Sequence, residues 1–385
     1  MQSSLQISLQ SLPERQVLAT WWCELESRAD LSFFTSWSWI NAWLDLLPDP
    51  AAARLLVAEH DGQRVGMGIV VEGSARLLKT IGIRAWRLHT TGIFEIDDLS
   101  MEYNDFLMDR SVVDTTRMAM LNWLVWQAPK GIVEIRGSSA SIRKLAETPA
   151  PKMVARRVPL TSYLVSLIEA RARQGYLPLI SSNVRSQIRR SLKAYSAAGE
   201  IKVEAAADLP QALEYLARLR AMHDRRWRER GVRSGFAHDE VAKRFHDALI
   251  RHSFPRGEVQ MLRVTVGDSD LGYIYNFVFR GVISYYQSGL NYELIDNKHG
   301  RPGLVCHALA IEHNMKLGHA WYDLLAGDYR YKASLATNLE PMAHCVFTRE
   351  TPLVRMDAYA RRVVDSRKSN KSPTAAWSAD DAAAT

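Results

Sequence analysis

Residues 282–332 read VISYYQSGLNYELIDNKHGRPGLVCHALAIEHNMKLGHAWYDLLAGDYRYK. Alternating apolar and polar residues predict a strand over 282–290, and a loop at 291–303 follows it. A helix is expected from about residue 304 to 317, and a strand from 320 to 325. One face of the first strand is expected to carry Val282, Ser284, Tyr286, Ser288 and Leu290. The order strand, loop, helix, strand predicts an α/β layer.

The loop before this helix carries two glycines and two basic residues. A helix N-terminus presents unpaired N–H groups and the positive end of the helix dipole, an arrangement that suits a phosphate. Gly300 and Gly303 would let the backbone approach a ligand closely, and Lys298 and Arg301 would add positive charge. An ordinary strand-to-helix connection would also use glycine and proline, so the local pattern leaves both interpretations open.

The same order of elements extends upstream and occurs twice. In the second half a helix from Asp208 to about Arg230 and another over 238–253 precede strands at 258–266 and 271–280. A weaker copy in the first half has a hairpin at 54–71, a helix at 112–127 and a strand at 131–137. We therefore predict an α/β (α+β) protein of two similar domains, 1–160 and 161–355, each with a mixed sheet flanked by helices. The tail at 366–385 lacks apolar periodicity and is expected to be disordered.

Composition narrows the class of protein. The 385 residues are 47% hydrophobic and 24% charged, which is typical of a globular protein. Three dispersed cysteines argue against a disulfide framework or a zinc site. No signal peptide and no run of about 20 apolar residues is evident, so a cytoplasmic protein is expected, with peripheral contact to the inner membrane left open. The net charge of +7 favours an anionic partner such as a phosphate-bearing ligand, a membrane surface or a glycan.

Four short motifs, in order, carry a family resemblance. The segment from Asp323 through Gly327 to Tyr331-Lys332 resembles the signature D-hydrophobic-x-x-G-x-x-x-Y-K of CelD-like acetyltransferases, FemAB-related members of the GNAT superfamily. The other three motifs are at 34–39 (FTSWSW), at 182–190 (SNVRSQIRR), and at 286–289 (YQSG) followed by 300–303 (GRPG). The resemblance covers about residues 33–350 and implies tandem GNAT-like domains with the acyl-donor site in the second.

The resemblance also implies roles for individual residues. In GNAT chemistry an amine attacks a thioester carbonyl directly, and the strand before the phosphate loop, here 282–290, offers N–H groups to the carbonyl oxygen. Tyr331 is expected to protonate the leaving sulfur, with Tyr329 as the second choice. Asp323 could orient Lys332 or the acceptor amine, or form a structural ion pair with Lys332. The residues expected to bind the donor are Lys298, Gly300, Arg301, Gly303 and Ser288, and those expected to bind the acceptor are Tyr286, Gln287 and Asp328.

The sequence leaves more than one acyl donor and more than one acceptor in consideration. The GNAT loop pattern is [Gln/Arg]-x-x-Gly-x-[Gly/Ala], and Asn297-x-x-Gly300-x-Pro302 departs from it. Acyl-CoA, above all acetyl-CoA, is the expected donor, and the acceptor is an amine or hydroxyl of a sugar, polysaccharide precursor or metabolite. A FemAB-like enzyme would use aminoacyl-tRNA instead, which is the one role foreseen for a nucleic acid. A third hypothesis is a non-catalytic GNAT-fold accessory protein of an exopolysaccharide machine.

Charge and histidine patterns add less. Six basic residues and no acidic ones lie between Arg171 and Lys193, and seven arginines lie between Arg218 and Arg233. Clusters of basic residues like these are typical both of solvated helix faces and of phosphate-binding surfaces. His307 and His313 are six residues apart, unlike a helical zinc pair, so no metal is expected. The weaker candidates for a base are Glu293, Asp296 and His223, the last on an apolar helix face.

Overall fold

The computed structural model describes residues 5–77, 81–99, 101–127, 131–296, 298–327 and 329–357, with the side chains of 76, 77, 81 and 82 excepted. The tail expected to be disordered, 366–385, lies outside these residues. The described residues form two compact units, the first of 5–160 with 341–357 and the second of 161–340. The sequence had placed residues 341–355 in the second domain. The structure groups 341–349 with the first unit because that half of β13 (Asn338–Arg349) pairs with β6 (Ile132–Ser138).

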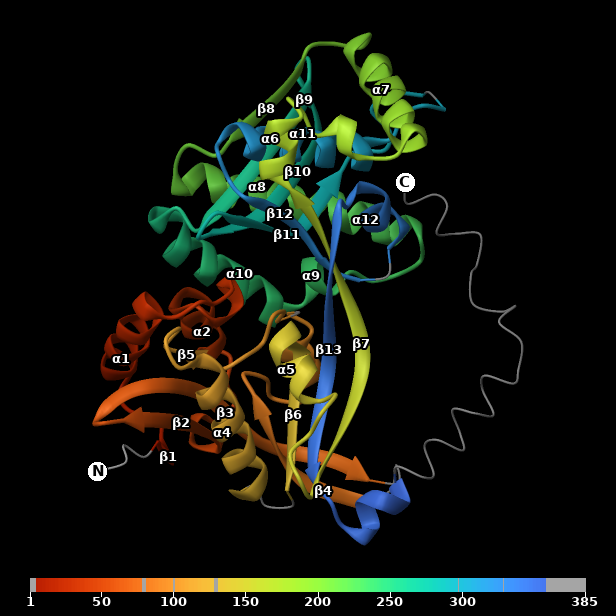
Figure 1. Cartoon of the computed structure of the whole chain (residues 1–385). Helices are drawn as coiled ribbons and strands as arrows, with labels where there is room; N and C mark the ends of the chain where they lie inside the picture. Colours follow the sequence, from red (N-terminus) through yellow and green to blue (C-terminus); the bar gives the residue numbers. More distant parts are fainter. Residues whose placement is uncertain are drawn as a thin grey trace. The chain divides into compact units, whose positions relative to one another are not determined.

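The second unit is built on six strands in the order β7-β12-β11-β10-β9-β8 (Figure 1). β12 and β11 pair in parallel, whereas β7 with β12, β11 with β10, β10 with β9 and β9 with β8 pair antiparallel. The strands are β7 (Met153–Ser166), β8 (Ile201–Ala205), β9 (Val259–Val266), β10 (Ser269–Phe279), β11 (Val282–Leu290) and β12 (Trp321–Ala326). The helices are α6 (Leu167–Ala172), α7 (Ser182–Ser196), α8 (Leu209–Glu229), α9 (Gly235–His238), α10 (Glu240–Ser253), α11 (Pro302–Lys316) and α12 (Arg330–Leu335).

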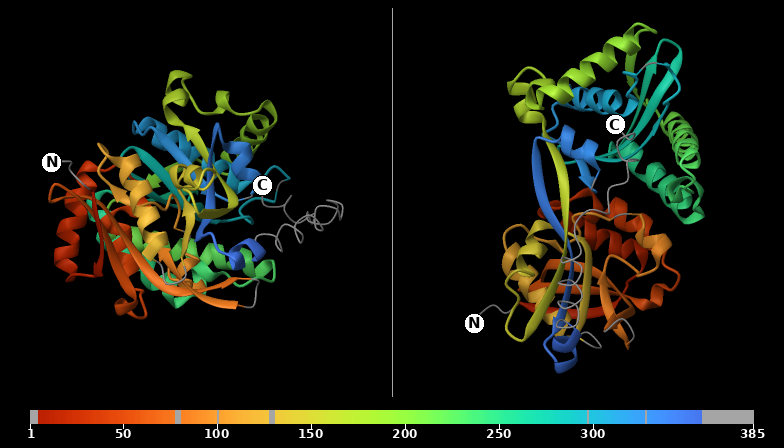
Figure 2. Two further views of the ribbon diagram at one scale, coloured as in Figure 1. Left: turned by 60° about the horizontal axis from the view of Figure 1, so that its bottom comes forward. Right: turned by 90° about the vertical axis from the view of Figure 1, so that its right-hand side faces the viewer.

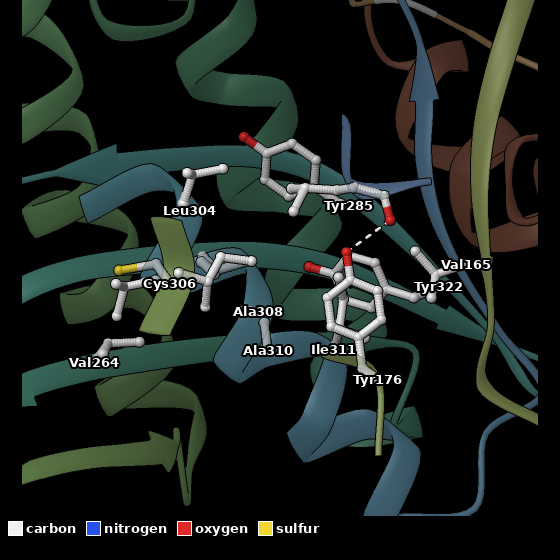
Figure 3. Close-up of a cluster of buried hydrophobic side chains, with 14 of the residues drawn as sticks. Val165, Tyr176, Val264, Tyr285, Leu304, Cys306, Ala308, Ala310, Ile311 and Tyr322 are labelled. Carbon is white, nitrogen blue, oxygen red and sulfur yellow. Dashed lines mark hydrogen bonds between the residues drawn. The ribbon is translucent and has the colours of Figure 1, made fainter. Parts of the chain in front are cut away.

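The helices of this unit cover both faces of its sheet (Figure 2). On β10, Tyr273 meets Tyr215 of α8, with ring centroids 5.2 Å apart, while its neighbour Ile274 belongs to the core that includes α11. Successive residues of a strand point to opposite faces, so α8 and α11 lie on opposite sides of the sheet. Figure 3 shows the α11 side of this core, where the Tyr176 hydroxyl donates to the Leu335 carbonyl at 2.6 Å.

The first unit repeats the scheme in a looser form. Its strands follow the order β1-β2-β3-β4-β6-β13, with β5 beside β3 and with β4 and β6 parallel. The strands are β1 (Gln6–Ser11), β2 (Ala53–His60), β3 (Gln63–Leu77), β4 (Ile81–Leu88), β5 (Leu107–Met108) and β6. The helices are α1 (Arg15–Arg28), α2 (Trp37–Leu44), α3 (Phe94–Asp97), α4 (Val113–Gln127) and α5 (Ala140–Leu145). Mixed sheets flanked by helices in both units confirm the predicted fold class. None of the helices in the described ranges is long and apolar enough to cross a membrane.

Two local expectations in the second unit need correction. Helix α11 starts at Pro302 rather than at Leu304, because proline at the first helical position loses no hydrogen bond and has a helical φ. The side chains of β11 do not alternate over its whole length. Gln287 pairs with Tyr275 and Tyr285 pairs with Asn276, which leaves Tyr286 as an extra residue in a bulge. The predicted common face of Val282 to Leu290 is therefore wrong, since the bulge reverses the alternation.

A glycine sets how closely α8 packs on β11. A Cβ on Gly289 would lie 2.3 Å from the carbonyl oxygen of Leu219 and 2.8 Å from its Cα, both backbone atoms of α8. Backbone cannot move aside as a flexible side chain can, so any larger residue would push the helix off the strand.

Gly289→Ala should lower the free energy of unfolding by about 1–3 kcal/mol, the usual cost of overpacking. Urea denaturation of the two variants and the wild type measures this. Gly303→Ala is the matched control, because its Cβ would meet only Leu290 Cδ1 at 3.6 Å, and it should lose no stability. Equal stability of Gly289→Ala and wild type would contradict the close approach.

Candidate active site

Strands β11 and β12 run together for three residue pairs and then part. Val282, Ile283 and Ser284 pair with Trp321, Tyr322 and Asp323. Beyond that point β11 continues to Leu290, whereas β12 turns away through Leu325, which has a left-handed φ of 62°. The buried Asp323 carboxylate holds this turn by accepting the Leu325 N–H at 2.8 Å and the Ser162 hydroxyl at 2.7 Å. The parting strands open a space at the end of the sheet.

The two adjacent tyrosines of β11 point to opposite faces of the sheet, as successive residues of a strand do. Tyr285 is buried against His307 of α11, edge to face, with centroids 4.5 Å apart. Tyr286 instead packs against His246 of α10 at 4.8 Å and Phe236 of α9 at 6.3 Å. The bulge at Tyr286 inserts one residue into the pairing with β10 and so reverses the alternation beyond it, which brings Ser288 to within 2.9 Å of the Tyr285 hydroxyl. Both faces of the sheet therefore supply walls to the space between the parting strands.

A pocket of about 230 Å³ occupies this region. Six of the residues first expected to act in catalysis or to bind the donor or acceptor line it: Tyr286, Gln287, Ser288, Gly303, Tyr331 and Lys332. The remaining walls are His223, Arg226, Trp227, Arg230, Tyr285, Leu290, Tyr292, Leu304, His307 and Tyr329. The pocket thus joins the end of β11, the first turn of α11, the last turns of α8 and the start of α12.

Three hydroxyl groups form a chain along one wall. A side-chain hydrogen bond joins Tyr331 to Tyr285, and the Tyr285 hydroxyl lies 2.9 Å from Ser288 Oγ. Burial raises the pKa of Tyr285 to about 12, partly offset by its hydrogen bonds to Ser288 and Tyr331. Burial first, and then Tyr285, raise the pKa of Tyr331 well above its ordinary value. Both effects favour the protonated form, so Tyr331 stays protonated at neutral pH.

His307 lies between these tyrosines and is almost fully buried. Its ring stacks on Tyr331 at a centroid distance of 5.3 Å and an interplanar angle of 19°. Burial, reinforced by the charge of Lys332, lowers the pKa of His307 to about 3, so the imidazole is neutral at physiological pH. Its Nδ1 is buried and has no hydrogen-bond partner among the described residues. In the sequence His307 drew notice only as a possible metal ligand, so its place in the pocket was missed.

Lys332 is fixed by the end of β12. Its Nζ donates to the carbonyl of Ala326 at 2.6 Å and to that of Leu325 at 3.3 Å, and it lies 5.8 Å from the centroid of the Tyr329 ring. The side chain is 6% exposed, so the ammonium group is held at a defined place in the pocket wall. Asp323 holds the same turn of β12 by accepting the Leu325 N–H. It is not among the pocket-lining residues that the structure describes.

The predicted phosphate loop contributes less to this pocket than expected. Among the residues predicted there, Gly303 lines the pocket, whereas the described lining lacks Lys298, Gly300 and Arg301. The Arg301 guanidinium donates to Gln187 of α7 at 2.8 Å, and Lys298 is exposed. Asp328, predicted to bind the acceptor, and Asn297 of the loop pattern lie outside the described residues.

The weaker candidates for a general base either bond to other side chains or do not line the pocket. His223 lines the pocket, but its Nε2 accepts from Trp227 Nε1 at 2.9 Å and its Nδ1 lies 2.9 Å from the Ser234 hydroxyl. Burial lowers the pKa of His223 to about 4. Glu293 pairs with Arg225 at 3.3 Å, and Asp296 is exposed.

Residues of α8 were the main omission. Arg226 and Arg230 line the pocket, together with Trp227 of the same helix and Tyr292 of the loop after β11. The run of arginines is evident in the sequence, but the sequence did not show which of their side chains point into the pocket. Four-residue spacing places Arg226 and Arg230 on one face, and the packing of α8 on β11 turns that face to the pocket. In the part of the chain that is described, no cluster of three His, Cys, Asp or Glu side chains could hold a metal ion.

The corresponding space in the first unit is filled by the chain itself. There β4 and β6 pair in parallel through Trp86 and Val133, and the segment 101–105 packs against the end of β6. The Asn104 N–H donates to Gly137 O at 2.9 Å, and a Cβ on Gly137 would lie 2.3 Å from the Met101 carbonyl. The open pocket of this type therefore belongs to the second unit.

Comparisons with known proteins agree with the geometry. Residues 182–333, which run from α7 into α12 and include the pocket, match the acetyltransferase (GNAT) domain family. The chain therefore carries a GNAT-fold acetyltransferase domain. Its fold is similar to that of FemX, with a TM-score of 0.57 and 9% identity over 91% of this chain and 99% of that one.

A second solved structure shares the fold. It is the C-terminal domain (DUF2156) of a protein assigned as a lysylphosphatidylglycerol synthetase from Agrobacterium fabrum. The TM-score is 0.50 and the identity 11%, over 89% of this chain and 95% of that one. At such identities the likeness concerns the fold alone. No curated protein matches the chain.

The buried neutral His307 predicts a dependence of stability on pH. The unfolded imidazole takes up a proton below pH 6.5, whereas the folded one does so only near pH 3, so acid favours the unfolded state. Each such group contributes a slope of about 1.4 kcal/mol per pH unit in this window. His307→Gln should make the fall in unfolding free energy between pH 6 and 4 shallower by about that amount, measured by urea denaturation. An unchanged slope would show that His307 is protonated in the folded protein.

Proposed function

We propose that the chain is an acyltransferase that moves an acyl group, above all acetyl from acetyl-CoA, to an amine or hydroxyl group. The observation that carries this proposal is the chain of hydroxyls from Tyr331 through Tyr285 to Ser288, placed where β11 and β12 part inside the segment that matches the GNAT family. The likeness of the segment from Asp323 to Lys332 to the CelD-like signature supports a sugar, a polysaccharide precursor or a related metabolite as acceptor.

The reaction we propose is a direct transfer. The acceptor nitrogen or oxygen attacks the thioester carbonyl and loses its proton to solvent, and the tetrahedral intermediate then collapses with cleavage of the C–S bond. Tyr331 gives its proton to the departing thiolate, and Tyr285 and Ser288 offer the path by which a proton can be restored. The high pKa of Tyr331 suits a proton donor, because the group must be protonated before each turnover. Backbone N–H groups of β11 stabilise the oxyanion in this proposal.

The other predicted residues take binding and positioning roles in this proposal. Gly303 brings the first turn of α11 close to the donor, and Lys298, Gly300 and Arg301 add to the donor site outside the pocket. Tyr286 and Gln287 contact the acceptor from the strand, and Asp328 is assigned to the acceptor by the family resemblance. Asp323 acts through the turn that it holds rather than by touching the substrate. Lys332 points an ammonium group at the reaction centre from the end of β12.

An aminoacyl-tRNA donor is the second candidate. Arg185, Arg189 and Lys193 of α7 follow one another at four-residue spacing and form a basic stripe on that helix. A stripe of this kind suits the phosphates of an RNA acceptor arm. Helix α7 also contacts the loop before α11, where the Ser191 hydroxyl donates to His299 O at 2.7 Å.

Tyr331→Phe should lower kcat by about a hundredfold or more while leaving the Kd for acetyl-CoA within about twofold, because the hydroxyl acts on the leaving group and not on donor binding. Calorimetry of acetyl-CoA and a thiol-release assay with a panel of amino sugars measure the two quantities. The control is Tyr273→Phe, which removes a hydroxyl bonded to Asp270 at 2.8 Å elsewhere in the sheet, and it should keep full activity.

Binding measurements on the same purified protein also distinguish the two possible acyl donors. Binding of acetyl-CoA by the wild type supports the CoA reaction. Retention of charged tRNA at low salt, without acetyl-CoA binding, would replace it with aminoacyl transfer. Full activity of folded Tyr331→Phe would overturn the assignment of Tyr331 as the proton donor.

A further inference from the structure

The described wall of the pocket is positively charged. Arg226, Arg230 and Lys332 line it, and no aspartate or glutamate does so among the lining residues that the structure describes. Lys332 already serves two backbone carbonyls at the end of β12. The two arginines enter from the other side, at the C-terminal end of α8, where they face Tyr292 and the first turn of α11.

Arg226 is held in a defined orientation. Its guanidinium carbon lies 4.0 Å from the centroid of the Tyr292 ring, and one Nη lies 3.4 Å from Glu229 at the helix surface. Stacking on an aromatic ring orients the planar guanidinium, a group whose fork of N–H donors matches planar and tetrahedral anions. Arg230, one turn further along α8, is exposed and extends the same wall. Both arginines oppose the burial that raises the pKa of Tyr292, so their charge reaches this end of the pocket.

The N-terminus of α11 lines the same pocket as the two arginines. Gly303 and Leu304 of its first turn line the wall, and the N-cap residue Arg301 makes no capping hydrogen bond with its side chain. A helix of this length presents unpaired N–H groups and a positive dipole end there. His307, one turn into the same helix, is a second sign of a ligand, since it is 2% exposed and its Nδ1 lacks a partner in the described structure.

We infer that Arg226 and Arg230 of α8, together with the first turn of α11, bind a phosphate-bearing group of a substrate, and that these arginines supply the charge first expected of Lys298 and Arg301. The inference rests on the proposed function, because it takes this pocket as the site of transfer. A phosphate group could enter as the diphosphate of the acyl donor or as part of the acceptor. Charge-assisted hydrogen bonds from an arginine to phosphate are strong enough to dominate binding at such a site.

The test uses inorganic pyrophosphate as the probe and calorimetry on the full chain. Arg226→Ala and Arg230→Gln should each weaken pyrophosphate binding by about tenfold to a hundredfold, the range for loss of a hydrogen bond to a charged group. Arg228→Ala is the matched control, because Arg228 lies on the same helix and pairs with Asp224 at 2.9 Å, and it should change the Kd by less than about twofold. Arg230→Gln removes an exposed side chain, so a folding defect is not expected from it even if Arg226→Ala disturbs Tyr292.

Competition identifies the source of the phosphate. If acetyl-CoA displaces pyrophosphate, the arginines hold the diphosphate of the donor. If pyrophosphate binds equally well beside saturating acetyl-CoA, they hold a phosphate of the acceptor. Unchanged pyrophosphate affinity in both arginine variants, with acetyl-CoA binding and transfer intact in the wild type, would overturn this inference alone. Absence of acetyl-CoA binding and transfer in a protein that still binds pyrophosphate through the arginines would overturn the proposed function alone.

Discussion

The site depends on one constraint, the separation of β11 from β12 after three pairs of residues. Two local features enforce it. The bulge at Tyr286 breaks the regular course of β11, and the left-handed Leu325 turns β12 away. Asp323 then holds that turn, and Lys332 returns to cap the carbonyls that the turn exposes. Without the separation, Tyr285, Ser288 and Tyr331 would line a closed sheet instead of a pocket.

The remaining structure keeps this opening rigid. Helix α8 lies directly on β11 because Gly289 has no side chain, which brings Arg226 and Arg230 to the pocket. On the other face a buried amide network joins β9, β10 and α11, with Gln260 bonded to Asn276 at 2.9 Å and to Asn314 at 3.0 Å. Buried polar networks of this kind fix relative positions because every misalignment leaves a polar group unsatisfied. The two helices that supply the walls are therefore tied to strands of the same sheet.

The sequence predicts the elements well where the pattern is local. The strand expected at 258–266, the hairpin at 54–71 and the helix at 112–127 each depend on patterns within a few residues, and β9, the β2–β3 pair and α4 confirm them. The bulge at Tyr286 was missed because it is defined by pairing with Tyr275 and Asn276 across a turn. The direction of Arg226 was missed because it depends on contact between α8 and β11. Motif resemblance pointed to Tyr331 and Lys332, whereas Tyr285 and His307 enter the site through packing.

The central claim is that the donor thioester lies between the parted strands, beside the hydroxyl of Tyr331. The most direct test is a crystal structure with an unreactive thioether analogue of acetyl-CoA. The account predicts the pantetheine arm between β11 and β12, its sulfur within hydrogen-bonding distance of the Tyr331 hydroxyl, and the acyl carbonyl facing the backbone of β11. An analogue bound away from this pocket, or with its sulfur remote from Tyr331, would contradict the account.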